Sequence, residues 1–311
     1  VVIDVSLINN QCLFRFERNG VVVDGVTLIG ELPEYNRNAI LRTQHCCDIA
    51  LTNDGPWAMD QETSPDENKS SRMFNLFGSS EVRIDKTVLQ GGWGCIGSSD
   101  ISGLYVNYST INRVDVHGRG GFFYLNGNNL QELGILYGCG FGEISITGGS
   151  YIGTKALIYH RADFPGGWYG GGWTVQNVRI AHDDYDFSVV DCWTNPIGSE
   201  NAVEELPWII NVQNVARLPR VDVNSLDTAP DPTLATLTRA IDIKVAADAV
   251  NVVAPMSFIV DGMVGSQRAR FAAMRVALLD MRPQDTGIRS KATISNVSAL
   301  YEGSSTAAST I

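Results

Sequence analysis

The sequence predicts an all-β protein, a right-handed single-stranded parallel β-helix, on two observations. A strand-like phrase recurs along the chain: a small polar residue, apolar residues at alternate positions, and then a turn. The first apolar residues of six such phrases follow one another at steps of 23, 33, 32, 30 and 34 residues: Val26, Ile49, Val82, Val114, Ile144 and Val178. Repeats of this length are typical of stacked architectures, because one unit cannot bury its apolar face alone. We expect these six residues to form one inward-facing file.

A second family of strands lies before or between these phrases. Most of its members are rich in aromatic and β-branched residues, which strands prefer; they are Ile40–Arg42, Met73–Phe77, Leu104–Tyr108, Phe122–Leu125, Leu157–Tyr159 and Phe187–Val190. Two or three strands per coil predict stacked parallel sheets. Leu133–Leu136 is a further strand candidate only eleven residues before Ile144. Either these two segments belong to different faces, or one coil is unusually short.

We expect the coils to form a body over residues 1–216, with inserted loops at residues 53–71, 161–172 and 192–207. Insertions in stacked folds gather on particular faces and are often binding elements. The composition changes near Arg217, after which aromatic residues and glycines are rare. Residues 217–311 are predicted either to continue the β-helix or to form a subunit-contact region. Within them we expect a short helix from Pro232 to about Ala240, followed by strands at Ile241–Val245, Phe258–Val264 and Val276–Met281.

Composition excludes several classes of function. The formal net charge is −11, whereas a surface that follows phosphates needs lysine and arginine, so no nucleic-acid partner is expected. No run of 18 apolar residues is present, so no membrane span is expected. None of the six cysteines stands in a CxxC pair, which favours buried structural thiols, with disulfides as the alternative. We expect no metal site and no cofactor.

Aromatic residues in polar, glycine-rich loops are the strongest functional signal. Flat aromatic faces suit the CH-rich faces of sugar rings, while carboxylates and arginine hydrogen-bond sugar hydroxyls. The residues expected to bind such a substrate are Trp168, Tyr169, Trp173, Trp193, Arg161 and His182. The alternative is that Trp168 and Trp173 cover the core beneath a loop.

Five residues are candidates for catalysis: Asp163, Asp183, Asp191, His160 and Glu132. Hydrolysis of a glycosidic bond needs two carboxylates, ~5 Å apart for retention and ~6.5–9.5 Å apart for inversion. The first pairs to test are Asp163 with Asp191 and Asp183 with Asp191. β-Elimination from a uronic acid instead needs a base and a cation, which His160, Tyr159 and Arg161 would supply. Solvated surface charges are the alternative for each carboxylate.

An alignment of three strand ends refines this site. Superposing Phe122–Asn126, Leu157–Arg161 and Ser188–Cys192 puts Leu125, His160 and Asp191 at one stacked position. Residues at one position on neighbouring coils lie about 5 Å apart. We therefore expect His160 and Asp191 to be neighbours.

The phrase at Asp24–Gly30, its relatives, the series from Val26 to Val178 and the tryptophan-bearing insertions carry a resemblance. Over roughly Cys12–Val215 the chain resembles bacteriophage tailspikes and the wider pectate-lyase-like group of parallel β-helices. The resemblance implies a homotrimer on the virion tail that binds, and often cleaves, a bacterial surface polysaccharide such as capsule or O-antigen. It carries over no catalytic residue.

The resemblance leaves the activity open between glycoside hydrolase and polysaccharide lyase. The alternatives are a non-catalytic tail fibre or adhesin that only binds the glycan, and a cellular polysaccharide lyase. The chain starts at Val1, inside a strand-like run and without Met. We therefore expect a further N-terminal part that contacts other phage tail proteins.

Overall fold

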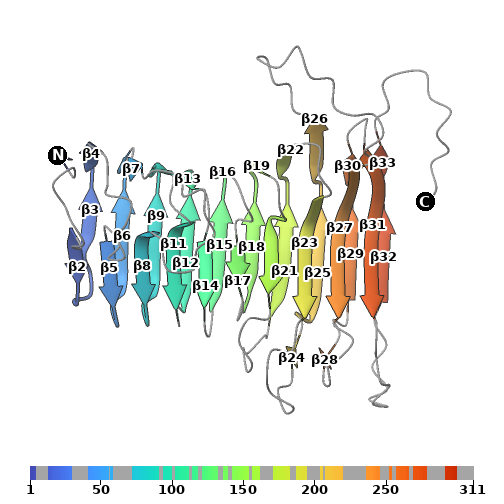
Figure 1. Ribbon diagram of the computed structural model, residues 1–311, viewed down its shortest axis with the longest axis horizontal. Coiled ribbons are helices and arrows are strands. Elements are labelled where there is room, and N and C mark those ends of the chain that lie inside the picture. Colours follow the sequence, from blue (N-terminus) through green and yellow to red (C-terminus); the bar gives the residue numbers. More distant parts are fainter. Residues whose placement is uncertain are drawn as a thin grey trace.

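The computed structural model describes residues 1–4, 13–29, 41–55, 57–58, 72–90, 94–99, 102–111, 114–117, 121–131, 136–138, 142–153, 156–161, 171–182, 187–194, 204–205, 207–219, 236–245, 252–253, 257–265, 269–278 and 291–299. Every regular element within these ranges is a β-strand. The strands stand side by side from the N-terminal to the C-terminal end of an elongated molecule (Figure 1). The protein is therefore all-β, as the sequence predicts.

Most strands belong to three long sheets, here named sheets I, II and III. Sheet I contains β2 (Phe14–Phe16), β5 (Leu41–Gln44), β8 (Arg72–Phe77), β11 (Gly94–Ser99), β14 (Val114–His117), β17 (Leu136–Gly138), β20 (Ile158–Arg161), β23 (Phe187–Thr194), β27 (Thr236–Val245) and β31 (Ala269–Leu278). Sheet II contains β3 (Val22–Asp24), β6 (Cys47–Thr52), β9 (Ser80–Asp85), β12 (Gly103–Asn107), β15 (Phe122–Asn126), β18 (Ile144–Thr147), β21 (Gly172–Gln176), β25 (Ile209–Gln213), β29 (Ser257–Asp261) and β32 (Lys291–Ser295).

Sheet III contains β13 (Thr110–Ile111), β16 (Asn129–Gln131), β19 (Ser150–Gly153), β22 (Arg179–His182), β26 (Ala216–Pro219), β30 (Val264–Gly265) and β33 (Ser298–Ala299). Three two-stranded sheets pair β1 (Val2–Asp4) with β4 (Thr27–Ile29), β7 (Trp57–Ala58) with β10 (Leu89–Gln90), and β24 (Glu204–Glu205) with β28 (Val252–Val253).

The chain passes from sheet I to sheet II to sheet III and then returns to sheet I. Each new strand pairs in parallel with the preceding strand of the same sheet. This order is compatible with the predicted parallel β-helix. The step between paired residues of sheet II is far from constant, from 19 residues between Tyr105 and Tyr124 to 48 between Asn211 and Ile259. Insertions between strands therefore absorb the differences in length.

The six residues expected in one inward file are all buried, but they do not form a single file. Ile49, Val82 and Ile144 belong to one file of sheet II, whereas Val114 belongs to sheet I. Val26 and Val178 follow the ends of two sheet II strands. The expectation of one file is wrong because the same phrase marks an inward-facing strand and its turn in any of the sheets.

A strand is present at each of the six predicted positions of the second family, four in sheet I and two in sheet II, although Ile40 itself lies outside the described residues. The ambiguity before Ile144 is also resolved. Leu136 starts β17 in sheet I, whereas Ile144 starts β18 in sheet II. Leu136, the described end of the first segment, and Ile144 thus belong to different faces, as one of the two sequence alternatives required.

The C-terminal segment differs from expectation at two points. The strand expected at Phe258–Val264 is divided at Gly262 into β29 and β30. Where a short helix was predicted up to about Ala240, β27 begins at Thr236 and pairs with β23 on one side and β31 on the other. Pairing on both edges outweighs the local helix signal at Pro232. The strand predicted at Ile241–Val245 is correct, and β27 together with β29 to β33 extends the same three sheets.

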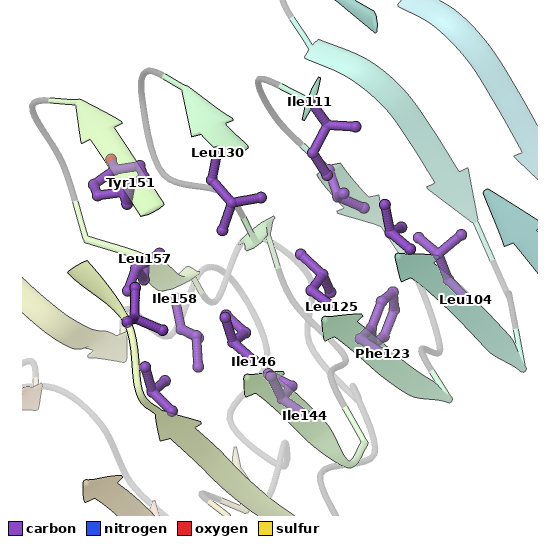
Figure 2. Close-up of a cluster of buried hydrophobic side chains, with 14 of the residues drawn as sticks. Leu104, Ile111, Phe123, Leu125, Leu130, Ile144, Ile146, Tyr151, Leu157 and Ile158 are labelled. Carbon is purple, nitrogen blue, oxygen red and sulfur yellow. The ribbon is translucent and has the colours of Figure 1, made fainter. Parts of the chain in front are cut away.

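The core is the column of side chains that the sheets enclose (Figure 2). Leu104, Phe123 and Ile144 follow one another along sheet II, and Ile158 meets them from sheet I. Tyr151 joins from sheet III, and all five side chains are essentially inaccessible. Function is therefore confined to the outer faces and the loops.

A repeated corner follows the strands of sheet II. Each strand is followed by a residue in the left-handed region, with φ between 48° and 68°: Gly25, Asn53, Lys86, Tyr108, Gly127, Gly148, Asn177, Asn214, Gly262 and Asn296. Glycine and asparagine tolerate this conformation best. The next residue turns inward, and in four consecutive coils it is a buried polar residue: Asp54, Thr87, Ser109 and Asn128.

These four polar residues satisfy backbone groups of the corner. Ser109 Oγ accepts a hydrogen bond from Thr87 N (3.0 Å), and Asn128 Oδ1 accepts one from Ser109 N (2.9 Å). Asn128 Nδ2 donates to the Val106 carbonyl (2.8 Å). Asp54 Oδ1 likewise accepts from Val26 N (2.7 Å), but its Oδ2 is buried without a hydrogen-bond partner. Burial accordingly raises the pKa of Asp54.

We predict that Asp54→Asn raises the free energy of unfolding by about 1 kcal/mol at pH 7. The new amide would donate to the Val23 carbonyl, which is equivalent to Val106 in the bond made by Asn128. Because the folded-state pKa of Asp54 is raised, ionisation costs stability only as the pH rises above the unfolded value of about 4. Urea denaturation at pH 7 and pH 3.5 checks this, since the gain should vanish at the lower pH. Asp48→Asn, at an exposed position, should show no gain at either pH.

Candidate functional site

The outer face of sheet I brings a tyrosine and two carboxylates into one row. Tyr159 on β20 pairs with Asp191 on β23, which pairs with Asp242 on β27. Their neighbours Ile158 and Val190 are fully buried, whereas Tyr159 and Asp191 are half-buried. Since side chains alternate along a strand, Tyr159 and Asp191 face outward. Paired positions on neighbouring strands lie about 4.8 Å apart.

A second row lies two residues further along the same strands. Arg161 pairs with Trp193, and Trp193 pairs with Lys244. By alternation these positions share the outer face with Asp191. We call the six positions Tyr159, Arg161, Asp191, Trp193, Asp242 and Lys244 the Asp191 face. Three residues predicted from the sequence, Arg161, Asp191 and Trp193, thus occupy neighbouring positions.

Asp242 differs from Asp191 in its surroundings. Its side chain is fully buried and forms an ion pair with Arg239, whose side chain is 7% exposed (Nε to Oδ2, 3.4 Å). Removing one partner of such a pair would leave an uncompensated buried charge. Sequence reasoning missed Asp242 and Lys244 because the segment after Arg217 is simpler and more aliphatic than the rest of the chain. The alternation of apolar and charged residues in Ile241–Lys244 was the signal that pointed to a strand with a charged face.

His160 does not neighbour Asp191 as the strand alignment required. It pairs with Cys192, the residue after Asp191, and the side chains of His160 and Cys192 are fully buried. A shift of one residue moves a side chain to the opposite face of the sheet. The third aligned segment, Phe122–Asn126, is β15 and belongs to sheet II, so Leu125 is not in the same file either.

Burial lowers the pKa of His160 to about 4. The imidazole is therefore neutral in the folded protein at pH 7, and only the unfolded chain gains a proton as the pH falls below about 6.5. We predict that the free energy of unfolding falls by about 3 kcal/mol between pH 6.5 and pH 4 on account of this residue. Denaturation as a function of pH measures the effect.

The controls for this prediction are two substitutions. In His160→Leu the fall in the free energy of unfolding between pH 6.5 and pH 4 should be smaller than in the wild-type protein by about 3 kcal/mol. His45 is an exposed histidine whose φ of 51° suits asparagine. His45→Asn should show the same slope of the free energy of unfolding against pH as the wild-type protein. Equal slopes in wild-type protein and His160→Leu would show that His160 does not titrate in this way.

Trp173 on β21 lies in the inward file between Ile144 and Ile210 and is 1% exposed. Its indole N–H donates to the Gly142 carbonyl (2.9 Å), and its ring lies 5.8 Å from that of His160. A ligand on the outer surface does not reach either ring.

His182 ends β22 in sheet III, so it does not share a sheet with Asp191. The other predicted site residues lie outside the described part of the chain; they are Glu132, Asp163, Asp183, Trp168 and Tyr169.

Within the described residues no three histidine, cysteine or acidic side chains are grouped so that they could hold a metal ion. Cys46, Cys47 and Cys192 carry free thiols, and two of them are buried, in agreement with a structural role. In the same part of the chain, no helix has the length and apolar character needed to cross a membrane.

The sequence matches no protein-family model, and no curated protein matches it. The function is therefore argued from the geometry of the outer faces.

Proposed function

We propose that the protein is a right-handed parallel β-helix of the tailspike class that binds a bacterial surface polysaccharide and cleaves it at the Asp191 face. The observation that carries the proposal is the register of β20, β23 and β27, which aligns Tyr159 with Asp191 and Arg161 with Trp193. The proposal includes a homotrimer and attachment to a virion tail.

The chemistry of this face suits a sugar chain. A carboxylate and a guanidinium hydrogen-bond hydroxyls, and aromatic rings beside them cover the CH-rich faces of the sugar. In the proposed hydrolysis Asp191 is one carboxylate of the catalytic pair. Asp242 is buried and paired with Arg239, so the second carboxylate in the proposal is Asp163 or Asp183.

The test begins with an array of bacterial capsular and O-antigen polysaccharides. We expect the protein to bind at least one of them and to shorten its chains, as measured by size-exclusion chromatography. Asp191→Asn should lower the cleavage rate about 100-fold or more while binding persists. Asp48→Asn, which removes the same charge from an exposed position on sheet II, should cleave at the wild-type rate. Failure to bind any arrayed polysaccharide would contradict the proposal.

A binding-only adhesin is the second candidate function. It is favoured by the burial of Asp242, because within the described row Asp191 then has no second accessible carboxylate beside it. Binding without chain shortening would identify this function. Chain shortening with new ultraviolet absorbance from an unsaturated uronate would instead identify a lyase.

A further inference from the structure

A separate group of aromatic side chains lies on the outer face of sheet II. Tyr105 and Tyr124 pair across β12 and β15, and their rings stack with centroids 5.2 Å apart and planes 9° from parallel. Phe122, on the same strand as Tyr124, is 47% exposed, and its ring lies 6.3 Å from that of Tyr124. The Arg83 guanidinium lies 5.8 Å from the centre of the Tyr105 ring. These side chains form a continuous aromatic row.

Carboxylates fix the two tyrosine rings in place. The Tyr105 hydroxyl donates to Glu81 Oε1 (3.4 Å), and the Tyr124 hydroxyl donates to Glu143 Oε1 (3.1 Å). Burial, together with the neighbouring carboxylate, raises the pKa of each tyrosine, so both hydroxyls remain donors. Gly103 leaves room for the first contact, because a Cβ there would come within 3.3 Å of both Glu81 Oε1 and the Tyr105 ring.

The aromatic row ends differently on its two sides. Arg83 lies beyond Tyr105, whereas beyond Tyr124 the paired positions hold the small side chains of Ser145 and then Thr174. Since the separation of the ring centroids is close to that of neighbouring strands, the two rings face each other along the sheet. The far face of Tyr124 is therefore directed over Ser145 and Thr174.

Polar groups border this surface. In the adjacent outward row, Thr147 pairs with Gln176, and Gln176 Nε2 donates to Thr147 Oγ1 (3.2 Å). Glu143 lies at the opposite border, directly before Ile144, which pairs with Phe123 and with Trp173. We call the surface formed by Phe122, Tyr124, Glu143, Ser145, Thr174 and Gln176 the Tyr124 shelf.

We propose that the Tyr124 shelf is a second saccharide-binding site, distinct from the Asp191 face, for an uncharged sugar ring of the same polysaccharide. The CH face of the ring packs against Tyr124 and Phe122, and its hydroxyls bond to Glu143 and Gln176. This inference rests on the proposed function, because it takes the ligand to be a glycan.

The local chemistry favours an uncharged sugar over other occupants. Glu143 repels phosphates and acidic sugars, in keeping with the net charge of −11, whereas the charge of Glu81 is balanced by Arg83 (4.0 Å) on the far side of Tyr105. The hydroxyl and amide groups beside the rings would have to be desolvated beneath an apolar protein surface, whereas sugar hydroxyls replace their water.

The test uses the full chain on the same polysaccharide array, followed by titration calorimetry with the tightest-binding polysaccharide. Tyr124→Ser gives position 124 the same side chain as Ser145, its partner on the next strand. This variant should bind about tenfold or more weakly, the loss expected for one stacked ring. Tyr124→Phe keeps the ring and should bind within about threefold of wild type. Tyr108→Asn removes an exposed tyrosine from the neighbouring corner and should bind as wild type.

Phe122→Ser repeats the test at an exposed position if Tyr124→Ser fails to fold. Unchanged affinity in the Tyr124→Ser or Phe122→Ser protein, with cleavage still dependent on Asp191, would overturn this inference and leave the proposed function intact. No binding by the wild-type protein would overturn both. A change in oligomeric mass on light scattering, with affinity unchanged, would identify the shelf as a contact between copies and overturn the inference.

Discussion

Replacing Gly149 with alanine is expected to lower the free energy of unfolding by at least about 4 kcal/mol, or to prevent folding. Gly149 has a φ of 82°, and a Cβ at this position would lie 2.1 Å from the carbonyl oxygen of Asn128 and 2.7 Å from its nitrogen. Both atoms are backbone, so no side-chain rotation relieves the overlap.

Asn128 has little freedom to move away. Its carbonyl accepts a hydrogen bond from Ser150 N (2.9 Å), its Oδ1 accepts from Ser109 N, and its Nδ2 donates to the Val106 carbonyl. A displacement large enough to admit a methyl group would weaken three bonds, two to the preceding coil and one to the next. Leaving such buried groups unpaired costs about 1–3 kcal/mol each.

The adjacent Gly148 supplies a matched control. Its φ of 66° is also left-handed, but the nearest atoms to a Cβ there are backbone atoms of Gly127 at 3.8 and 3.9 Å. Gly148→Ala should therefore cost only the conformational strain, about 1–2 kcal/mol. Urea denaturation of the two variants measures the difference. Equal losses would show that the close contact with Asn128 relaxes on substitution.

The strand content could be predicted from the sequence because alternation and turn residues are local signals. The assignment of strands to sheets could not, because the phrases containing Val82 and Val114 look alike but lie in sheets II and I. Whole coils differ in length from 19 residues upward, so a uniform period misplaces the boundaries. The corner residues mark where each strand of sheet II ends, and they could have assigned strands to this sheet. Most of them are glycine or asparagine, although Lys86 and Tyr108 adopt the same conformation.

The candidate site could be predicted in part. Asp191 and Trp193 stand out because they are polar and aromatic residues next to an insertion. Their pairing with Tyr159 and Arg161 depends on a register that a one-residue error reverses, and that error placed His160 beside Asp191. The aromatic row of Tyr105 and Tyr124 was not recognised, since the two residues are 19 positions apart and each lies in an ordinary strand.

Replacing Trp173 with alanine is expected to lower the free energy of unfolding by about 3–5 kcal/mol, with no direct effect on polysaccharide binding. The glycine-rich stretch before Trp173 makes it resemble a loop residue, but the ring fills the inward file of sheet II between Ile144 and Ile210. Its removal leaves a cavity and deprives the Gly142 carbonyl of its indole partner.

Trp208 is the matched control for this prediction. It is 59% exposed, next to β25 in the same sheet, so Trp208→Ala should change the free energy of unfolding by no more than about 0.5 kcal/mol. Urea denaturation of both variants, together with titration of the folded protein against the bound polysaccharide, separates stability from recognition. If Trp173→Ala were as stable as Trp208→Ala but lost its affinity for polysaccharide, the tryptophan would have to contact the ligand. Its position in the core would then be wrong, because a ring at 1% exposure touches only protein.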